Sequence, residues 1–170
     1  MKRPVKATLI CLIIAATIGI GMYAYQGTKQ DTPIEGQPDL AVHVYKTPTC
    51  GCCTKWLEHL QQENIQVTYT DVENVAPVKV QRDIEQQYWS CHTGLTANGY
   101  AFEGHVPAKY IKQFLNNPAE DAIGLSVPAM PVGSPGMEYK DQFMPYQVLL
   151  MKKDGTAEVY AEITSYPQQF

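Results

Sequence analysis

Three cysteines lie within four positions in the segment TPTCGCCTKWLEHL, residues 47–60. Cys50 and Cys53 have the C-x-x-C spacing, which closes a small disulfide or chelates one metal ion. Cys52 adds a third sulfur, which a simple two-electron thiol exchanger does not need. Because thiolates are soft ligands and also exchange with disulfides, the segment predicts either a soft-metal site, favouring Cu(I), or a redox-active dithiol.

The cysteines lie at the start of a predicted helix. One apolar helical face is indicated by four residues at i, i+3, i+4 and i+7: Cys53, Trp56, Leu57 and Leu60. We expect the helix to begin at about Gly51, with Cys50 at its cap and Cys52 in its first turn. Unpaired N–H groups and the helix dipole lower thiol pKa values at such a place, so reactive thiolates are expected. A structural disulfide is the alternative, although a bridge of such short span stabilises little.

Cys91 and the adjacent His92 form a second group of candidate ligands, just before a predicted strand. In a sheet with parallel neighbours, the loop that enters this strand can lie beside the N-terminus of the first helix. We therefore expect the Cys91 sulfur to lie within about 10 Å of Cys53. This limit is generous, because the two sulfurs of a disulfide lie much closer together. Three residues are weaker candidates as ligands: His105, Met130 and Met137. A histidine at a helix start is about as readily a surface residue, and loop methionines more often fill gaps in packing.

The N-terminal segment predicts export. Residues 1–25 contain Lys2, Arg3 and Lys6 but no acid, and the nineteen residues 7–25 are all uncharged. This stretch is long enough to span a bilayer and has a poor cleavage site, which favours a retained anchor over a removed signal sequence. The rest of the chain is then expected in the periplasm, either soluble after cleavage or anchored to the inner membrane.

Charge and compartment narrow the choice of chemistry. Without the three basic residues of the leader, ten Lys and Arg remain against seventeen Asp and Glu, a net charge of −7 for the exported part. Such an acidic protein is not expected to bind nucleic acid. Cys11 lies in the apolar stretch and is interpreted as membrane-buried. The other four cysteines would lie in a compartment that permits disulfides.

One domain is expected after a linker. Residues 26–39 contain Gly and Pro without any periodicity, as in linkers, and residues 40–170 are long enough for a single core. The expected elements are a strand at 40–46, the first helix, a strand at 65–72, a weaker helix at 76–88, a strand pair at 94–97 and 100–103, a helix at 106–117, an irregular loop at 123–139 and a hairpin at 146–163. This order predicts an α/β sandwich with a mixed central sheet and a C-terminal β-hairpin.

Five segments carry a resemblance to a known family: VYKTPTCGCCTKWLEHL, DVENVAPVK, WSCHTG, GYAFEGHVPA and IGLSVPAMPVGSPGME. Together they resemble the CopG-like copper-resistance family, small periplasmic proteins with a thioredoxin-like fold and a C-x-C-C metal site. The similarity runs from about residue 40 to residue 160. It implies that residues 40–170 form a thioredoxin-like metal-binding domain. It also implies copper ligands at Cys50, Cys52, Cys53 and Cys91, and a redox role in copper tolerance.

The residues themselves leave several functions open. The favoured one is a cluster of cysteines, with His92 nearby, that holds one Cu(I) ion or a thiolate-bridged cluster and exchanges copper with periplasmic copper-handling proteins. Zinc is the rival metal, because three cysteines and one histidine are an ordinary zinc set. The alternative function is a periplasmic thiol–disulfide oxidoreductase, in which Cys50 attacks and Cys53 resolves. Residues 90–93 replace the cis-proline turn of thioredoxin-like enzymes, which disfavours this alternative. Cycling of Cu(I) with Cu(II) at the cysteine cluster, or thiol–disulfide exchange, would make the protein an oxidoreductase.

Overall fold

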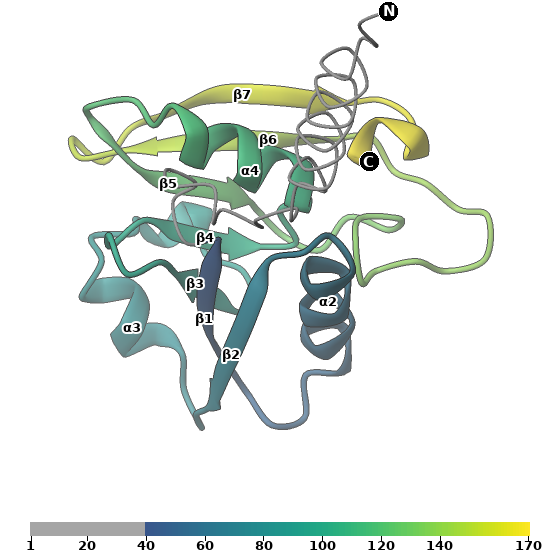
Figure 1. Cartoon of the computed structure of the whole chain (residues 1–170), viewed down its shortest axis with the longest axis horizontal. Helices are drawn as coiled ribbons and strands as arrows, with labels where there is room; N and C mark the ends of the chain where they lie inside the picture. The colour runs from purple at the N-terminus through teal and green to yellow at the C-terminus, as the bar shows by residue number, and fades with distance from the viewer. Residues whose placement is uncertain (1–39) are drawn as a thin grey trace, which may run out of the picture. The chain divides into compact units, whose positions relative to one another are not determined.

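The structure is a computed structural model that describes residues 40–170. The expected signal sequence or anchor (1–25) and linker (26–39) lie outside this range. Within it, no helix is both long enough and apolar enough to cross a membrane. The described part is built on one seven-stranded mixed sheet with the strand order β2-β1-β3-β4-β5-β6-β7 (Figure 1). The expectation of an α/β architecture with a mixed sheet is therefore confirmed.

The strands and helices follow one another along the chain. The strands are β1 (Ala41–Lys46), β2 (Gln66–Asp71), β3 (Thr93–Leu95), β4 (Ala101–Gly104), β5 (Ala122–Val127), β6 (Tyr146–Lys152) and β7 (Ala157–Ile163). Among residues 40–170 the α-helices are α2 (Gly51–Gln62), α3 (Ala76–Val80) and α4 (Ala108–Asn116), with 3₁₀ turns at Gln86–Tyr88 and Tyr166–Gln169. β6 and β7 pair antiparallel and form the predicted C-terminal hairpin.

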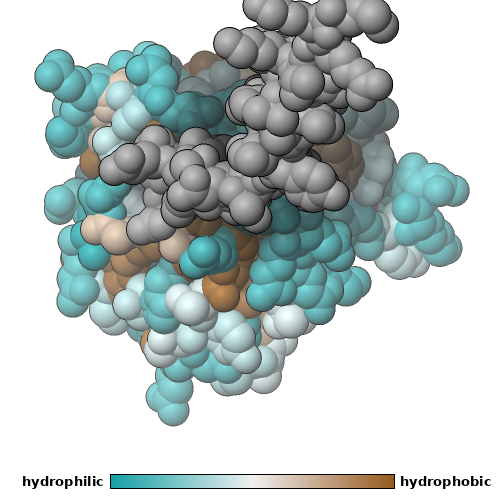
Figure 2. Space-filling view, in the orientation of Figure 1, coloured by the Kyte–Doolittle hydropathy of each residue, from teal (hydrophilic) through white to brown (hydrophobic). Residues whose placement is uncertain are grey.

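The unit β1–α2–β2 positions the cysteine segment. β1 and β2 run parallel, and α2 connects them. Val42 and Val44 of β1 pack in one core cluster with Trp56 and Leu60, two residues of the predicted apolar face of α2. Fully burying each such side chain stabilises the fold by roughly 1.5–3 kcal/mol. The space-filling view agrees with this one-sided burial, because the surface over α2 is mainly hydrophilic (Figure 2).

The pairing of β3 brings the Cys91 loop to the start of α2. β3 is antiparallel to β1, with Thr93 opposite Tyr45 and Leu95 opposite His43. The loop that enters β3 therefore lies at the carboxyl end of β1, which is the end where α2 begins. The sequence-based expectation assumed parallel neighbours, and that assumption is wrong. A parallel β3 would have placed this loop at the opposite end of β1.

Helices cover both faces of the sheet. α4 contributes Ile111 and Phe114 to the same core cluster as α2, so both helices cover one face. A smaller cluster of buried residues lies on the other face: Ile84, Leu95, Ala101 and Met151. Figure 1 shows α2 and α3 on opposite sides of β1 and β2.

Two expected elements are wrong. Residues 76–88 do not form one helix, because α3 ends at Val80 and Asp83 adopts a φ of 54°, which a right-handed helix excludes. Residues 123–139 are not irregular throughout, because β5 pairs parallel with β4 and antiparallel with β6. Gly124 permits this close pairing, since a Cβ there would lie 1.8 Å from the Ala101 carbonyl oxygen.

Candidate metal centre

The tip of α2 presents three of the predicted cysteines. Cys50 is the N-cap residue, and Cys52 and Cys53 lie in the first turn, as predicted. Cys50 and Cys53 form a disulfide with their Cα atoms 5.3 Å apart, whereas Cys52 and Cys91 are free thiols. The Cys52 Sγ lies 3.6 Å from the Cys50 Sγ. Local sequence spacing therefore brings three sulfurs together and allows two of them to bond.

Cys91 adds a fourth sulfur from the loop before β3. The Sγ atoms of Cys50, Cys52, Cys53 and Cys91 all lie within 4.8 Å of one another. This agrees with the expected closeness of Cys91 to Cys53. Cys53 is buried, and the other three are partly exposed. The four-sulfur group thus opens towards the surface, where an ion or another thiol can reach it.

Two buried histidines flank Cys91. The Cys91 Sγ lies 3.2 Å from His92 Nδ1 and 3.4 Å from His105 Nε2. One ligand atom from each of these three residues lies within 4.8 Å of those of the other two. His105 was predicted as a weaker candidate that could equally lie at the surface; the structure buries it completely beside Cys91. Nitrogen donors therefore adjoin the four sulfurs on the Cys91 side.

The loop after β5 orients His105. Its Nδ1 donates a hydrogen bond of 2.8 Å to the Pro135 carbonyl oxygen, so the Nε2 atom that faces Cys91 carries the lone pair. The next residue, Gly136, has a φ of +85°. A Cβ at this position would lie 2.7 Å from the backbone nitrogen of Trp56 and 2.8 Å from the Cys52 carbonyl oxygen. Only glycine permits this close approach of the loop to α2.

His92 carries an unpaired polar atom. Its side chain is completely buried, and its Nε2 has no hydrogen-bond partner among the described residues. The ring of Trp56 lies 4.3 Å from the His92 ring, and Trp56 Nε1 is itself occupied by a 2.8 Å hydrogen bond to the Val106 carbonyl oxygen. A buried polar atom without a partner costs on the order of 1–3 kcal/mol, and such atoms mark places where an ion or other ligand would fit.

Burial sets the protonation of the donors. It lowers the pKa of His92 well below the ordinary value and lowers the pKa of His105, so both rings are neutral near pH 7. Burial, together with the neighbouring Cys52, raises the pKa of the Cys91 thiol to about 11. Cys91 therefore keeps its proton at neutral pH until a cation displaces it. Cys50 and Cys53 do not titrate while bonded, so the expected thiolates of this pair stay a prediction.

A buried ion pair supports the Cys91 loop from the α3 side of the sheet. Glu103 in β4 pairs with Lys79 and accepts hydrogen bonds from the Ser90 N–H at 2.6 Å and the Thr93 hydroxyl at 2.7 Å. These bonds hold the chain on both sides of the Cys91–His92 pair. Sequence reasoning missed Lys79 and Glu103. Each stands alone in its segment, and no local pattern distinguishes a buried charge pair from two solvated charges.

The two candidate methionines lie in the loop between β5 and β6. Met130 is half-exposed and lines a surface groove together with Met144. Met137 directly follows Gly136, in the part of the loop that packs on α2. Their roles as ligands of the cysteine centre stay predictions.

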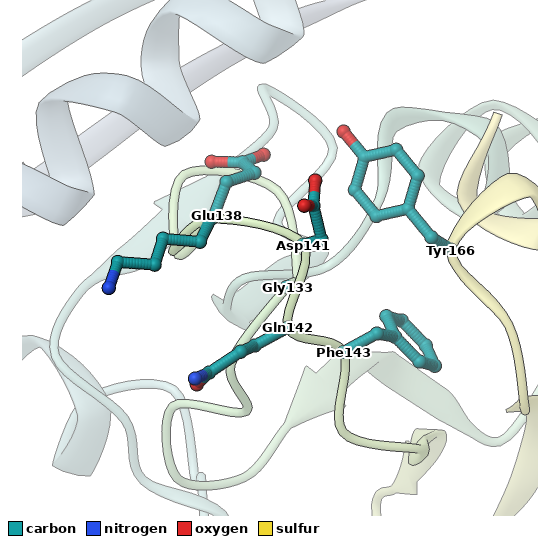
Figure 3. Close-up of a pocket in the computed structure, with 7 residues that line it drawn as sticks. Gly133, Glu138, Asp141, Gln142, Phe143 and Tyr166 are labelled. Carbon is teal, nitrogen blue, oxygen red and sulfur yellow. The ribbon is translucent and has the colours of Figure 1, made fainter.

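A separate cavity of about 370 Å³ lies between this loop and the C-terminal 3₁₀ turn (Figure 3). It is lined by Gly133, Glu138, Lys140, Asp141, Gln142, Phe143 and Tyr166. Figure 3 shows the carboxylates of Glu138 and Asp141 and the hydroxyl of Tyr166 pointing to the same side. None of the lining residues is a cysteine or histidine, so the cavity is not part of the metal centre.

Comparison with known proteins identifies the family. Residues 88–137 match a family described as "Protein of unknown function, DUF411", and no curated protein matches the chain. A solved structure named copper resistance protein copG, form 1, is 38% identical, with a TM-score of 0.70; the match covers 75% of this chain and all (100%) of that one. Form 2 is 39% identical with a TM-score of 0.68, covering 72% of this chain and 97% of the other. At this identity and coverage, the chain belongs to the CopG family of copper-resistance proteins.

Proposed function

We propose that this protein binds Cu(I) as its cargo, through the sulfurs of Cys50, Cys52, Cys53 and Cys91, and that it acts in copper tolerance. The observation that carries the proposal is the gathering of these four sulfurs within 4.8 Å. Soft thiolate ligands favour Cu(I), whereas Mg²⁺ and Ca²⁺ prefer oxygen ligands. The two solved relatives are named copper resistance proteins, which supports the same metal.

The neighbouring histidines support a site for more than one ion. His92 and His105 are neutral imidazoles, and the atoms that they present to Cys91, Nδ1 of His92 and Nε2 of His105, are nitrogen donors that a metal ion could use. Four sulfurs and two nitrogens exceed what one Cu(I) ion needs, so we propose a thiolate-bridged cluster. The disulfide must first gain two electrons and two protons, because only the reduced Cys50 and Cys53 are thiol ligands.

We further propose that the domain has a thioredoxin-like core and works in the periplasm. The order β2-β1-β3-β4, with β3 antiparallel to its two neighbours, supports such a core, to which β5, β6 and β7 add an extension. The basic and apolar residues 1–25 support export, and a disulfide is compatible with an oxidising compartment. Its partners would be copper ions, periplasmic copper-handling proteins and, if the anchor is retained, the inner membrane.

An anaerobic Cu(I) titration of the reduced full chain against a chromophoric Cu(I) chelator tests the copper proposal. We expect more than one Cu(I) per chain, and a lower number in Cys52→Ser. Cys11→Ser is the matched control, because this cysteine lies in the apolar N-terminal stretch and should leave the titration unchanged. A Zn(II) affinity above the Cu(I) affinity would contradict the proposal.

The Cys50–Cys53 disulfide favours a second candidate function, thiol–disulfide exchange with protein substrates. In this reaction the closed disulfide takes two electrons from a substrate dithiol, or, in the reverse direction, the Cys50 and Cys53 thiols give two electrons to a substrate disulfide and close their own bond. Reduction of insulin disulfides by the prereduced chain separates the two functions. Activity that Cys52→Ser leaves intact, in a protein that retains no Cu(I), would favour the oxidoreductase.

A further inference from the structure

Two exposed methionines share one surface groove. Met130 and Met144 are 50% and 55% exposed, and both line a groove of about 300 Å³ beside the start of β6. The backbone N–H of Met144 donates to the Val132 carbonyl oxygen at 2.9 Å, so the two ends of the loop run side by side there. Single exposed apolar side chains need no explanation, but two soft sulfur-bearing ones in one groove form a possible binding surface.

The backbone of the groove is stiff. Pro128, Pro131 and Pro145 also line it, and each methionine is followed directly by one of these prolines. Because proline fixes its own φ and restricts the residue before it, the backbone that carries both thioethers has little freedom. The groove is therefore already formed before anything binds in it.

The groove adjoins the cysteine centre through Ala129. The carbonyl oxygen of Ala129, another lining residue, accepts a 2.9 Å hydrogen bond from the Ser90 hydroxyl. The same hydroxyl oxygen lies 4.0 Å from the Cys91 Sγ. Ala129 has a φ of 61°, a conformation that favours glycine, so the loop holds this contact against a local backbone preference. Cys91 is partly exposed, and the Ser90 hydroxyl connects its sulfur to the groove, so an ion leaving the groove could pass to this sulfur.

We propose that Met130 and Met144 form an entry site, which binds an incoming Cu(I) ion and passes it to Cys91. This inference rests on the proposed function. Thioethers are soft, uncharged ligands, which suits Cu(I) and disfavours harder cations such as Mg²⁺ or Ca²⁺. The transfer exchanges ligands without any change in oxidation state. The bond from Cu(I) to a thioether breaks as the bond to the Cys91 sulfur forms, and the thiol proton goes to water.

Stopped-flow transfer of Cu(I) from a chromophoric chelator tests the entry site. The protein is the reduced full chain in detergent, with Cys11→Ser in every variant. Met130→Leu and Met144→Leu remove the sulfurs while nearly conserving volume. We expect the double variant to take up Cu(I) about tenfold more slowly, the lower end of effects seen around metal sites, and to reach the same final stoichiometry. Met151→Leu is the matched control, because this methionine is 1% exposed in β6 and should leave the rate unchanged.

A spectroscopic measurement tests binding without transfer. In a chain with Cys52→Ser and Cys91→Ser and the disulfide closed, Ag(I) serves as a closed-shell substitute for Cu(I). We expect it to shift the ¹³C-methyl NMR signals of Met130 and Met144 and to leave that of Met151 in place.

Each outcome bears on a separate claim. Equal uptake rates, or unshifted methyl signals, would overturn the entry site while leaving the copper centre intact. A double variant with a lower final stoichiometry would place the methionines in the centre itself and also overturn the entry role. A wild-type chain that takes up no Cu(I) would overturn the proposed function, and the entry site with it.

Discussion

Cys91 is the residue at which sulfur and nitrogen donors meet. Its Sγ belongs to the four-sulfur group and also lies 3.2 Å from His92 Nδ1 and 3.4 Å from His105 Nε2. Burial keeps the thiol protonated, so the metal-free centre carries no stranded negative charge at this position. A cation that replaces the proton would join the two groups of donors through one sulfur.

We expect Cys91→Ser to weaken Cu(I) binding more than any other single change in the described part. The hydroxyl is a hard, neutral ligand, so the variant should bind fewer ions and hold them at least about tenfold less tightly. Competition with a Cu(I) chelator measures both quantities. Ser90→Ala is the matched control, since it removes a neighbouring hydroxyl but no sulfur. Equal Cu(I) stoichiometry in Cys91→Ser and the wild type would remove Cys91 from the ligand set.

The buried histidines predict a loss of stability in acid. His59 Nε2 accepts a 3.1 Å hydrogen bond from the Ala108 N–H, and burial lowers the pKa of His59, as it does for His92 and His105. A lowered histidine pKa means that the unfolded chain binds more protons. The free energy of unfolding should therefore be greatest above pH 7 and decrease as the pH falls below about 6.5.

Urea denaturation of the metal-free protein at pH 7.5 and pH 5.5 checks this dependence. His59→Gln keeps an acceptor for the Ala108 N–H but cannot titrate, so its loss of stability in acid should be smaller than that of the wild type. An identical pH dependence in the variant would assign the effect to other groups.

Among the elements, the loop after β5 connects the centre to the backbone of the first turns of α2. Gly136 lies against the α2 backbone, and its neighbour Pro135 accepts the hydrogen bond that orients His105. Gly136→Ala would hold an alanine at a φ of +85° and place its Cβ 2.7 Å from the backbone nitrogen of Trp56. We expect a loss of about 1–3 kcal/mol in the free energy of unfolding, together with weaker Cu(I) binding.

Chemical denaturation and Cu(I) titration of the same variant measure both effects of Gly136→Ala. Gly51→Ala is the matched control, because no atom lies within 4 Å of a Cβ added at the first position of α2. It should be neutral or slightly stabilising. An unchanged free energy of unfolding and unchanged Cu(I) binding in Gly136→Ala would contradict the prediction, because the loop would then accommodate a Cβ at this position.

Substitutions in the Lys79–Glu103 ion pair behind the Cys91 loop should affect the free energy of unfolding and Cu(I) binding differently. Glu103→Leu removes both carboxylate oxygens and leaves the Lys79 ammonium buried without its charge partner, and breaking a buried pair in this way costs about 3–5 kcal/mol. Adding Lys79→Met should restore much of that stability. Cu(I) binding should stay weak in the double variant, since the carboxylate that accepts the Ser90 N–H is still absent.

Calorimetry and Cu(I) competition on the single and double variants follow the two quantities. Recovery of Cu(I) binding along with stability in the double variant would show that Glu103 acts only in folding.

Elements with a local pattern were predictable from sequence, and contacts between distant segments were not. α2 and the β6–β7 hairpin follow from apolar spacing and from the turn at Asp154-Gly155. β5 was missed because the prolines and glycines that follow it dominate the composition of its segment. The burial of His105 depends on Pro135, thirty positions along the chain, a contact that no period or motif records.

At the scale of the whole molecule, one topological feature assembles the centre. Because β3 runs antiparallel to β1, the Cys91 loop and the α2 N-terminus lie at the same end of the sheet. The sequence-based reasoning placed them together on an incorrect assumption about strand direction. Strand direction depends on the end of the sheet from which the chain enters the strand, and the short segment at 93–95 carries too little pattern to determine it.

Because the four-sulfur group contains a disulfide, the amount of metal that the protein can store depends on the supply of electrons. Closing the Cys50–Cys53 bond withdraws two of the four sulfurs. Under the proposed function, a population of chains would hold Cu(I) in proportion to its reduced fraction. A cell that ran short of periplasmic reductant would then lose copper capacity without making less of the protein.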